Sequence, residues 1–352
     1  MIKNIKIANK ILGQGNPIFF IAEAGVNHNG SIELAMKLVD QAKNCGADAI
    51  KFQTFKAENL NTVNAPKSSY HIKTTGDDIK QSWYELLKTQ EITYDMHVQL
   101  IKYCNEKNII FLSTPYDTDS LMLLNELNVH AFKIASTDTN NIPFLEEVAK
   151  LRKPTILSTA FCNFQEVENA VATLRSFKLN DIIVCQCTGN YPSKLEDSNL
   201  RVLSKYSKEL DCLTGYSDHT KEYINPIAAV PYEICLYEKH FTLDKTLEGP
   251  DHRMSLEPKE LKKTIDLLRQ AEKTLGQYDK LVSEDEKENR IKLRKSLVAA
   301  KDIDKNTIIN KSMIKIKRPG SGIQPVEFNN IIGKKINKNL KKDELFSYEF
   351  LD

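Results

Sequence analysis

The chain has 352 residues, of which 41% are hydrophobic and 27% are charged, and its formal net charge is only +2. This length allows two domains or one large domain with an appendage, and the hydrophobic share is sufficient for a sizeable core. The near balance of charge argues against nucleic acid and against membrane surfaces as partners, so an anion must be bound by locally placed Lys and Arg.

The sequence carries no signal for export or for a membrane span. No apolar run approaches the roughly 20 residues that cross a bilayer, and residues 1–16 lack the long apolar core of a signal peptide. The seven cysteines form no CxxC pair, and Cys185 and Cys187 lie two apart on one expected strand, where bridging is rare. We therefore expect reduced thiols in a cytoplasmic protein.

Eight short apolar runs alternate with helical patterns. The runs cover residues 17–23, 48–53, 109–114, 131–136, 154–159, 181–187, 213–217 and 234–240. The helical patterns cover residues 31–44, 93–107, 121–127, 144–150, 165–175, 200–206, 225–232 and 258–275, and a polar insertion follows residue 53. Such alternation implies parallel strands joined by right-handed crossovers. Eight units in about 270 residues predict a (β/α)8 TIM barrel. An open doubly wound sheet is the alternative, but no GxGxxG follows any run.

The character of the sequence changes after about residue 280. Residues 281–294 are highly charged and contain few apolar residues, which predicts an exposed helix or a linker. Residues 295–352 combine short β-like pieces with many turns. A unit of about 60 residues is marginally stable alone, so we expect it to pack against something.

Reactive or hydrogen-bonding residues end almost every apolar run. A barrel has its active site where strands end and the following loops begin, so these residues should converge on one mouth. They are Glu23, Lys51, Gln53, Ser113, Thr114, Lys133, Ser136, Ser158, Thr159, residues 186–188, residues 217–219 and His240. Strands that simply end at the surface explain the Ser and Thr residues well. They do not explain Lys51, Lys133, Glu238 and Lys239 in or near buried runs, because an unpaired buried charge is costly.

Lys51 and Lys133 indicate an anionic substrate that carries phosphate or carboxylate. The hydroxyls of residues 114, 136, 158 and 217 are suitable neutral partners for phosphate oxygens. A lysine that forms a Schiff base, as in aldolases, remains the alternative.

His219 and His240 end adjacent runs, where two neutral imidazoles can reach one divalent metal ion and leave positions for water and substrate. A structural role is the alternative. Ser217, Asp218 and His219 are contiguous, so they cannot fold back into a hydrolytic triad, and the chain has no GxSxG elbow.

Three further residues each allow two interpretations. Glu23 can bind substrate hydroxyls or move a proton, or it can form a structural ion pair with a barrel lysine. Asp251, in GPDHRMS, can bind sugar hydroxyls or act in acid–base chemistry, or it can belong to a Pro-Asp turn. Arg318, in KRPGSG, is on this basis a surface arginine.

Taken in order, ten segments resemble the bacterial sialic acid synthases. They are IAEAGVNHNGS, KFQTFKAENL, FLSTPYD, FKIAS, ILSTA, CTGNYP, GYSDHT, AAVPY, EKHFTLDK and GPDH. The later KRPGSGI and GKK resemble the antifreeze-like (SAF) domain of that family. The resemblance runs from about residue 17 to the end, and it implies a catalytic barrel at 1–280, a charged linker at 281–294 and a SAF domain at 295–352.

The resemblance implies that phosphoenolpyruvate condenses with open-chain N-acetylmannosamine and water to give N-acetylneuraminate and phosphate, with Mn²⁺ or Mg²⁺. The alternative is a legionaminate synthase that uses a 2,4-diacetamido-6-deoxyhexose. A pseudaminate synthase is disfavoured by AEAGVNH. Other possibilities are a related synthase that uses a phosphorylated sugar and a non-catalytic carbohydrate- or ice-binding protein. The intact lysine and histidine pairs argue against the last.

The resemblance also assigns residues by position. His219 and His240 become metal ligands. The candidate catalytic residues are Glu23, Lys51, Gln53, Lys133 and Asp251, with Glu23 expected to take the proton of the attacking water. The candidate substrate-binding residues are Thr114, Ser136, Ser158, Tyr191, Ser217 and Arg318. Arg318 is expected to reach the acceptor in the other subunit of a domain-swapped homodimer.

The sequence departs from the family pattern at three places. Ala160 stands where glycine is usual and is followed by Phe161 and Cys162 in place of methionine. Asp138 replaces a longer acid, and Arg253 follows GPDH. Because these loops are expected to line the mouth, the choice of acceptor depends on them.

Overall fold

The computed structural model describes residues 4–67, 72 and 82–352. The chain divides into two compact units, Met1–Gly276 and Gln277–Asp352. The polar insertion expected after residue 53 falls partly on residues 68–71 and 73–81, which lie outside the described residues.

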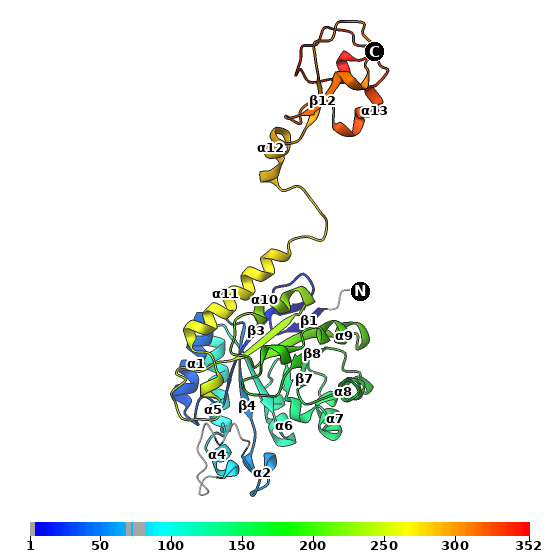
Figure 1. Ribbon diagram of the computed structural model, residues 1–352. Helices are drawn as coiled ribbons and strands as arrows, with labels where there is room; N and C mark the ends of the chain where they lie inside the picture. Colours follow the sequence, from blue (N-terminus) through cyan, green and yellow to red (C-terminus); the bar gives the residue numbers. More distant parts are fainter. Residues whose placement is uncertain (1–3, 68–71, 73–81) are drawn as a thin grey trace. The chain divides into compact units, whose positions relative to one another are not determined.

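Eight parallel strands form a nearly closed barrel in the first unit, as the sequence predicts (Figure 1). They are β3 (Phe19–Gly25), β4 (Ala49–Thr54), β5 (Ile110–Pro115), β6 (Phe132–Ile134), β7 (Thr155–Ser158), β8 (Ile182–Cys187), β9 (Leu213–Asp218) and β10 (Leu236–His240). Their order in the sheet is β5-β4-β3-β10-β9-β8-β7-β6. β5 and β6 lie against each other, so the two ends of the sheet meet.

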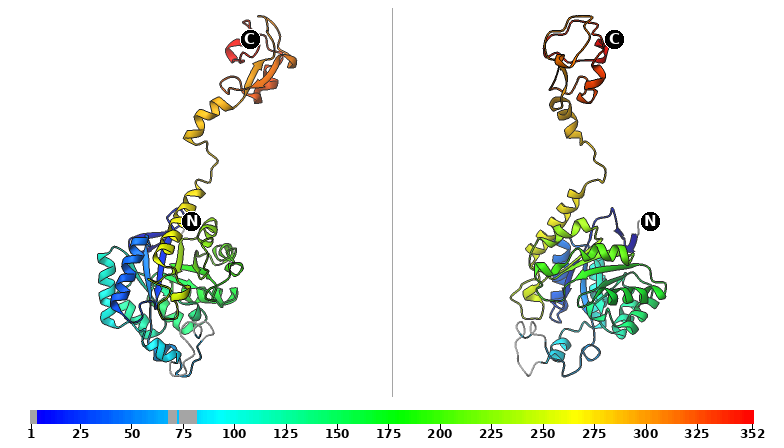
Figure 2. Two further views of the ribbon diagram at one scale, coloured as in Figure 1. Left: turned by 60° about the vertical axis from the view of Figure 1, so that its left-hand side comes forward. Right: turned by 45° about the vertical axis from the view of Figure 1, so that its right-hand side comes forward.

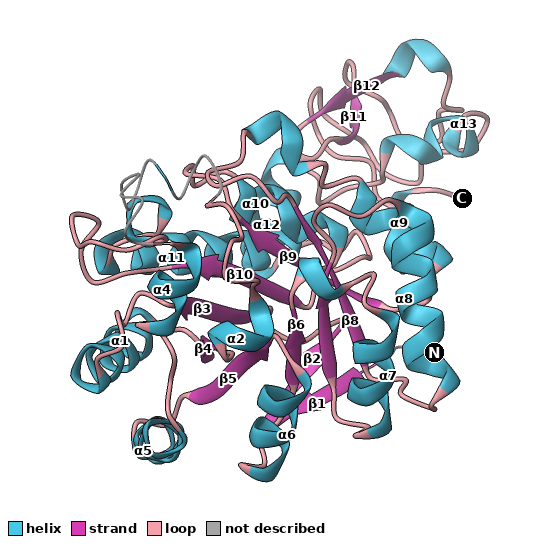
Figure 3. Cartoon of the chain, turned by 90° about the horizontal axis from the view of Figure 1, so that it is seen from below, coloured by secondary structure: helices cyan, strands magenta, loops and turns pink. Residues whose placement is uncertain are grey.

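Helices follow the strands and surround them, as the view along the barrel in Figure 3 shows. They are α1 (Ile32–Cys45), α2 (Ala57–Leu60), α4 (Trp83–Lys88), α5 (Tyr94–Glu106), α6 (Thr118–Glu126), α7 (Ile142–Lys150), α8 (Phe164–Ser176), α9 (Val202–Glu209), α10 (Asn225–Ala229) and α11 (Pro258–Leu275). Each connection between strands runs through a helix on the outside of the barrel, so all eight strands point in the same direction. Their carboxyl ends therefore surround one mouth.

Helix α1 illustrates how the sequence forms the outer layer. The hydroxyl of Ser31 accepts a hydrogen bond from the backbone N–H of Leu34, and Gly46 ends the helix with a positive φ of 92°. Its buried residues recur at helical spacing and form one stripe: Ala35, Leu38, Val39, Ala42 and Cys45. This stripe packs on the strands and on α5 and α11.

Alternation along the strands separates two cores. Residues such as Phe20, Phe52 and Tyr237 point outward into the helix layer, whereas their neighbours point into the barrel. The inner apolar set is Phe19, Ile21, Ala49, Ile110, Leu112, Ala131, Ile156, Ile183, Cys185, Cys235 and Leu236. These residues lie toward the amino ends of their strands, so they form a floor beneath the mouth.

An antiparallel hairpin of β1 (Asn4–Ile7) and β2 (Lys10–Gly13) closes this floor from outside. It lies beside the label N in Figure 2. Ile5, Ile7 and Leu12 pack into the inner apolar set. This hairpin is not predictable from the sequence, because its strands are only four residues long.

The second unit has a small core of its own. It contains α12 (Glu284–Leu293), the antiparallel strands β11 (Ser296–Ala299) and β12 (Ile314–Lys317), and α13 (Phe328–Ile331). Its buried core residues are Leu297, Ala299, Ile303, Ile309, Ile314, Ile323, Ile331, Ile336, Leu340 and Phe346. Helix α12 buries no residue, which agrees with the exposed, charged character expected of residues 281–294.

No helix among the described residues is long and apolar enough to cross a membrane. All seven cysteines lie in the described part of the chain, and each is a thiol rather than half of a disulfide.

Candidate active site

The alternation that builds the floor also places polar side chains above it. At the carboxyl end of each strand the inward positions are polar or charged, and their side chains are buried except that of Gln53, which is half-buried. The inward residues are Glu23, Lys51, Gln53, Thr114, Lys133, Ser158, Cys187, Ser217, Glu238 and His240. The convergence of strand ends expected from the sequence is therefore present in the structure.

Four of these residues form a buried chain of alternating charge. Lys51 Nζ lies 2.7 Å from Glu23 Oε2 and 3.8 Å from Glu238 Oε1. Lys133 Nζ lies 3.0 Å from the same Glu238 oxygen. Each of the four side chains is at most 5% exposed. Because every charge has an opposite neighbour, this cluster can exist on an apolar floor where a single charge could not.

The pKa values of the two carboxyl groups shift in opposite directions. Burial raises the pKa of Glu23 to about 7, although Lys51 opposes the shift, and the negative charge of Glu238 adds to it. Burial would also raise the pKa of Glu238, but Lys133 and Lys51 outweigh it and hold that pKa below its ordinary value. Near neutral pH, Glu238 is thus a carboxylate and Glu23 is poised to gain or lose a proton.

The four hydroxyl groups predicted to bind phosphate oxygens differ in their hydrogen-bond partners. Thr114 Oγ1 accepts from Lys51 Nζ at 3.0 Å, and Ser217 Oγ donates to Glu238 Oε1 at 3.3 Å. Ser136 Oγ instead accepts from the backbone N–H of Ala160 at 2.9 Å. Ser158 Oγ is buried and has no hydrogen-bond partner among the described residues. Such an unpartnered buried hydroxyl at the barrel mouth can donate to an oxygen of an anion.

The two histidines lie together at the mouth, with ring centroids 5.4 Å apart. His219 Nδ1 lies 2.6 Å from the carbonyl oxygen of Thr188, so this nitrogen carries the proton and donates. The other nitrogen, Nε2, lies 3.0 Å from the hydroxyl of Tyr191, whose ring stacks on His219 at 4.1 Å. The Thr188 carbonyl therefore fixes the tautomer in which His219 Nε2 carries the lone pair, and this lone pair accepts from the Tyr191 hydroxyl.

Burial lowers the pKa of His219 to about 4 and lowers that of His240 well below its ordinary value. Both rings are neutral at physiological pH, as metal ligands must be. His240 Nδ1 has no hydrogen-bond partner in the described part of the chain, and Asp251 Oδ2 lies 3.8 Å away. The pair fits a divalent cation chemically, and the ion itself stays a prediction.

The protein does not supply a complete coordination shell by itself. Within residues 4–67, 72 and 82–352, no three His, Cys, Asp or Glu side chains form a cluster that could hold a metal ion. An ion at His219 and His240 would complete its coordination with water or substrate, which is typical of a catalytic rather than a structural site.

Glu23, Gln53 and Asp251 converge over Gly25, which has a positive φ of 53°. A Cβ added at Gly25 would lie 3.4 Å from Asp251 Oδ2, 3.4 Å from Gln53 Nε2 and 3.5 Å from Glu23 Oε1. Burial raises the pKa of Asp251 to about 6. The structure thus brings together three of the residues expected to face the acceptor, and glycine keeps the space between them open.

Side-chain hydrogen bonds hold the loop that carries Asp251. Asn27 Nδ2 donates to the carbonyl of Phe241 and to Ser255 Oγ, both at 2.9 Å. His252, next to Asp251, contacts Asn29 Oδ1 at 3.2 Å through Nε2. The segment after β3 therefore anchors the segment after β10, and Asp251 belongs to a cross-linked loop rather than to an isolated turn.

The structure also shows where Ser217, Asp218 and Arg318 lie. Ser217 points inward and Asp218 outward, so the contiguous Ser-Asp-His is not a triad. Arg318 lies exposed in the second unit, where its Nε donates to the carbonyl of Leu293 at 3.0 Å. Its role at an acceptor site stays a prediction.

The family of the protein follows from comparison with known sequences. Residues 38–280 match the NeuB family, and residues 294–352 match the SAF domain. The chain belongs to the NeuB family. It is accordingly a phosphoenolpyruvate-dependent nonulosonic acid synthase, as the resemblance implies.

Individual relatives cover nearly the whole chain. The chain is 43% identical over 327 residues to the N,N'-diacetyllegionaminic acid synthase of Campylobacter jejuni, covering 92% of this chain and 97% of that protein. It is 38% identical over 344 residues to the protein of the same name from Legionella pneumophila, covering 97% and 96%. The crystal structure of N-acetylneuraminic acid synthetase from Leptospira borgpetersenii matches with a TM-score of 0.72 and 33% identity, covering 82% of this chain and 95% of that one.

Two residues in the NeuB barrel were not assigned a role from the sequence. Glu238 links both lysines, and Cys187 Sγ lies 3.6 Å from His219 Nδ1. Glu238 lies on the inward side of β10, two residues before the assigned His240. Cys187 lies on the inward side of β8, at the end of that strand. The period of two would have placed them at the mouth, but only the strand register shows what they touch.

Two residues that depart from the NeuB pattern, Phe161 and Asp138, lie in loops that follow the barrel strands. Phe161 has a positive φ of 65° and is 73% exposed. Its ring covers Gly189, where an added Cβ would lie 2.0 Å from the ring. A side chain at residue 189 would therefore displace the Phe161 ring from this position. Asp138 is buried and accepts from Asn141 Nδ2 at 3.0 Å.

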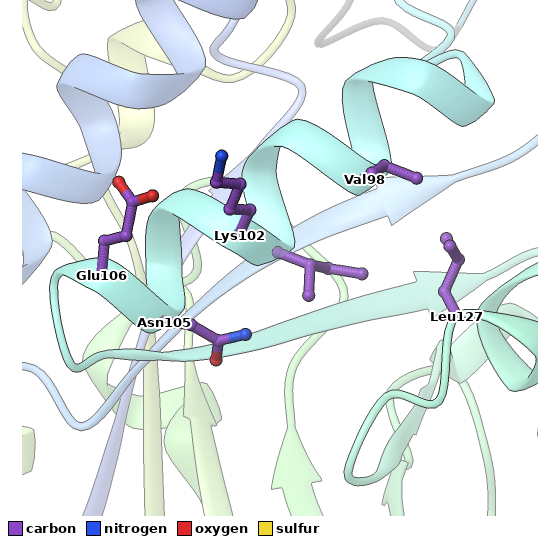
Figure 4. Close-up of a pocket in the computed structure, with 6 residues that line it drawn as sticks. Val98, Lys102, Asn105, Glu106 and Leu127 are labelled. Carbon is purple, nitrogen blue, oxygen red and sulfur yellow. The ribbon is translucent and has the colours of Figure 1, made fainter.

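A hollow of about 360 Å³ lies on the outside of the barrel and contains none of these residues (Figure 4). It is lined by one face of α5 and by Leu127 at the end of α6. Its lining combines Val98, Ile101 and Leu127 with Lys102, Asn105 and Glu106, and it includes none of the buried charged residues of the barrel mouth, so we place the chemistry at the mouth.

The substitution Glu23→Gln tests the raised pKa of Glu23. Because the folded-state pKa, about 7, exceeds the ordinary value of 4.5, folding favours the protonated carboxyl. Its contribution to stability is full below about pH 4.5 and is lost as the pH rises through about 7. Glutamine cannot ionise, so the free energy of unfolding of the native chain should fall relative to the variant by on the order of 2 kcal/mol between about pH 4.5 and pH 8.

Urea unfolding of both proteins across this pH range measures the difference. A constant difference between the two stabilities would show that Glu23 ionises at its ordinary pKa, and the account of the cluster would be wrong.

Proposed function

We propose that this NeuB-family enzyme condenses phosphoenolpyruvate with a 2,4-diacetamido-6-deoxyhexose to give N,N'-diacetyllegionaminate and inorganic phosphate. The observation that carries the proposal is the similarity to two legionaminic acid synthases, both of which are more similar to this chain than the Leptospira N-acetylneuraminic acid synthetase. N-acetylneuraminate, the product first expected from the sequence, has less support.

Lys51 and Lys133 bind the phosphate and carboxylate of phosphoenolpyruvate. Their Nζ atoms lie 3.8 Å and 3.0 Å from one oxygen of Glu238, so a single anion can contact both. Thr114 and Ser217 adjoin the lysines, and the buried hydroxyl of Ser158 gains the partner that it lacks. In this dry, pre-arranged site the lysines stabilise negative charge on the phosphate as it leaves.

The acceptor lies on the side of Glu23, Gln53, Asp251 and Tyr191. C3 of phosphoenolpyruvate forms the new bond to the aldehyde carbon, and Asp251 supplies the proton that the carbonyl oxygen takes up. Water then adds at C2 and gives one proton to Glu23. The bond between C2 and the phosphate oxygen breaks, the C2 ketone forms, and the departing phosphate takes up the proton of the C2 hydroxyl. The pKa values of about 7 for Glu23 and about 6 for Asp251 allow both carboxyl groups to exchange protons near neutral pH.

His219 and His240 hold a divalent cation, Mn²⁺ or Mg²⁺. When bound, such an ion supplies Lewis acidity toward the acceptor carbonyl. The residues of the chain provide two neutral nitrogens, and the carbonyl of Thr188 keeps His219 in the required tautomer. The unpartnered Nδ1 of buried His240 supports this assignment.

An acceptor panel tests the function. Purified protein, phosphoenolpyruvate and Mn²⁺ are combined with the 2,4-diacetamido-6-deoxyhexose, with N-acetylmannosamine or with phosphorylated N-acetylmannosamine. Phosphate release gives the rates, and mass spectrometry identifies the products. We expect kcat/KM to be at least about tenfold higher for the diacetamido sugar, which is the discrimination one or two polar contacts provide, and we expect chelation by EDTA to abolish turnover.

Faster turnover of N-acetylmannosamine would identify a neuraminate synthase instead. Undiminished turnover after exhaustive chelation would contradict the assignment of the two histidines to a metal ion.

The proposal includes a homodimer in which Arg318 of the SAF domain reaches the acceptor bound by the other subunit. The exposed position of Arg318 supports this. Arg318→Ala should raise the KM for the acceptor about tenfold and leave that for phosphoenolpyruvate unchanged, as expected for a lost binding contact. Arg290→Ala, at an exposed position of α12, is the control. A fully active monomer in sedimentation experiments would contradict the proposal.

A further inference from the structure

A second buried ion pair lies on the outer side of the barrel wall, directly behind the two histidines. Lys239 Nζ lies 2.6 Å from Asp218 Oδ2, and the two side chains are 3% and 0% exposed. Asp218 immediately precedes His219 and Lys239 immediately precedes His240. Neither side chain enters the mouth, because both point toward the helix layer.

The pair lies at the end of the ladder between two strands. Asp218 and Lys239 are the last register partners of β9 and β10. Beyond them, the backbone of each histidine bonds to a different neighbour: the carbonyl of His219 accepts from Ser193, and that of His240 accepts from Leu256, both at 2.9 Å. The pair is thus the last direct link between the two strands before the histidines.

Hydrogen bonds satisfy the pair on all sides. Asp218 Oδ1 accepts from the backbone N–H of Thr220 at 2.9 Å and from its hydroxyl at 2.8 Å. Asp218 Oδ2 also accepts from the hydroxyl of Tyr237 at 2.6 Å. Lys239 Nζ donates to the carbonyl of Thr220 as well. The carboxylate therefore clamps the segment on both sides of His219 and joins it to the strand that carries His240.

Stability alone does not explain this arrangement. A buried ion pair is often no more stabilising than apolar residues of similar size, because removing two charges from water offsets their attraction. What such a network can supply is a fixed geometry, since its bonds are directional and cross from one strand to the next. The geometry fixed here is that of two imidazole rings 5.4 Å apart.

We infer that Asp218 and Lys239 form a positioning pair that sets the spacing of His219 and His240 and thereby the affinity of the site for a divalent cation. The inference rests on the metal assignment made in the proposed function. The pair acts through the backbone of the residue that follows each member and contacts neither ion nor substrate.

The test is a Mn²⁺ titration of metal-free protein, read by the electron paramagnetic resonance signal of free Mn²⁺, so that turnover is not needed. The double variant Asp218→Asn with Lys239→Met removes both charges together and leaves no uncompensated charge. We expect it to bind Mn²⁺ about 10- to 100-fold more weakly than the native chain, the effect typical of residues that orient metal ligands.

A second variant keeps the inference testable if the double variant does not fold. Asp218→Glu retains both charges but lengthens the link by one methylene, so it should fold and still weaken Mn²⁺ binding. The control is Asp48→Asn, which breaks the ion pair of Asp48 with Arg269, 2.9 Å apart, at the amino end of β4. It should lower the melting temperature without changing Mn²⁺ affinity.

The outcomes separate the inference from the metal assignment. Weaker Mn²⁺ binding in a folded Asp218 variant, with native affinity in Asp48→Asn, supports the positioning role. Native affinity in a folded Asp218 variant overturns it and leaves the pair a purely structural element. If the native chain binds no Mn²⁺, the metal assignment itself is wrong, and the inference falls with it.

Discussion

The buried chain Glu23–Lys51–Glu238–Lys133 is the interaction on which the site depends. Four charges lie above an apolar floor, and each is tolerated only because an opposite charge is 2.7 to 3.8 Å away. Loss of Lys51 would leave the Glu23 carboxylate uncompensated, and loss of Glu238 would leave Lys133 uncompensated, because each of these end members has a single opposite neighbour. The same constraint makes the lysines ready for a ligand, because the oxygens of an anionic substrate can take the place of the carboxylates without uncovering a bare charge.

The floor beneath these charges determines how strongly they act. Ile5, Ile7 and Leu12 of the β1–β2 hairpin pack into the inner apolar set and close the amino end of the barrel. Without that closure, water would reach the cluster from below and weaken every electrostatic interaction in it. The raised pKa of Glu23 follows chiefly from burial of its carboxyl group.

The sequence predicts the barrel because eight apolar runs alternate with amphipathic helices, and it predicts the mouth because polar residues end those runs. It does not predict which charges pair. Glu238 reaches Lys51 and Lys133 across strands far apart in sequence, and Asp218 meets Lys239 only through the register of β9 and β10. The hairpin is missed because four-residue strands give too little periodicity. The acceptor is not predictable either, because it depends on loops such as the one that presses Phe161 onto Gly189.

The most direct measurement is the affinity of the chain for phosphoenolpyruvate, determined by titration calorimetry without acceptor. Glu238→Gln frees Lys133 and leaves Lys51 paired with Glu23 alone, so this variant should bind at least as tightly as the native chain. Combining it with Lys133→Met removes one charged contact, so binding should weaken about 10- to 100-fold relative to Glu238→Gln alone, the worth of one charged hydrogen bond. Lys153→Met, whose Nζ donates to Asn128 outside the site, should bind normally. Equal affinity of the folded double variant and Glu238→Gln would contradict the account.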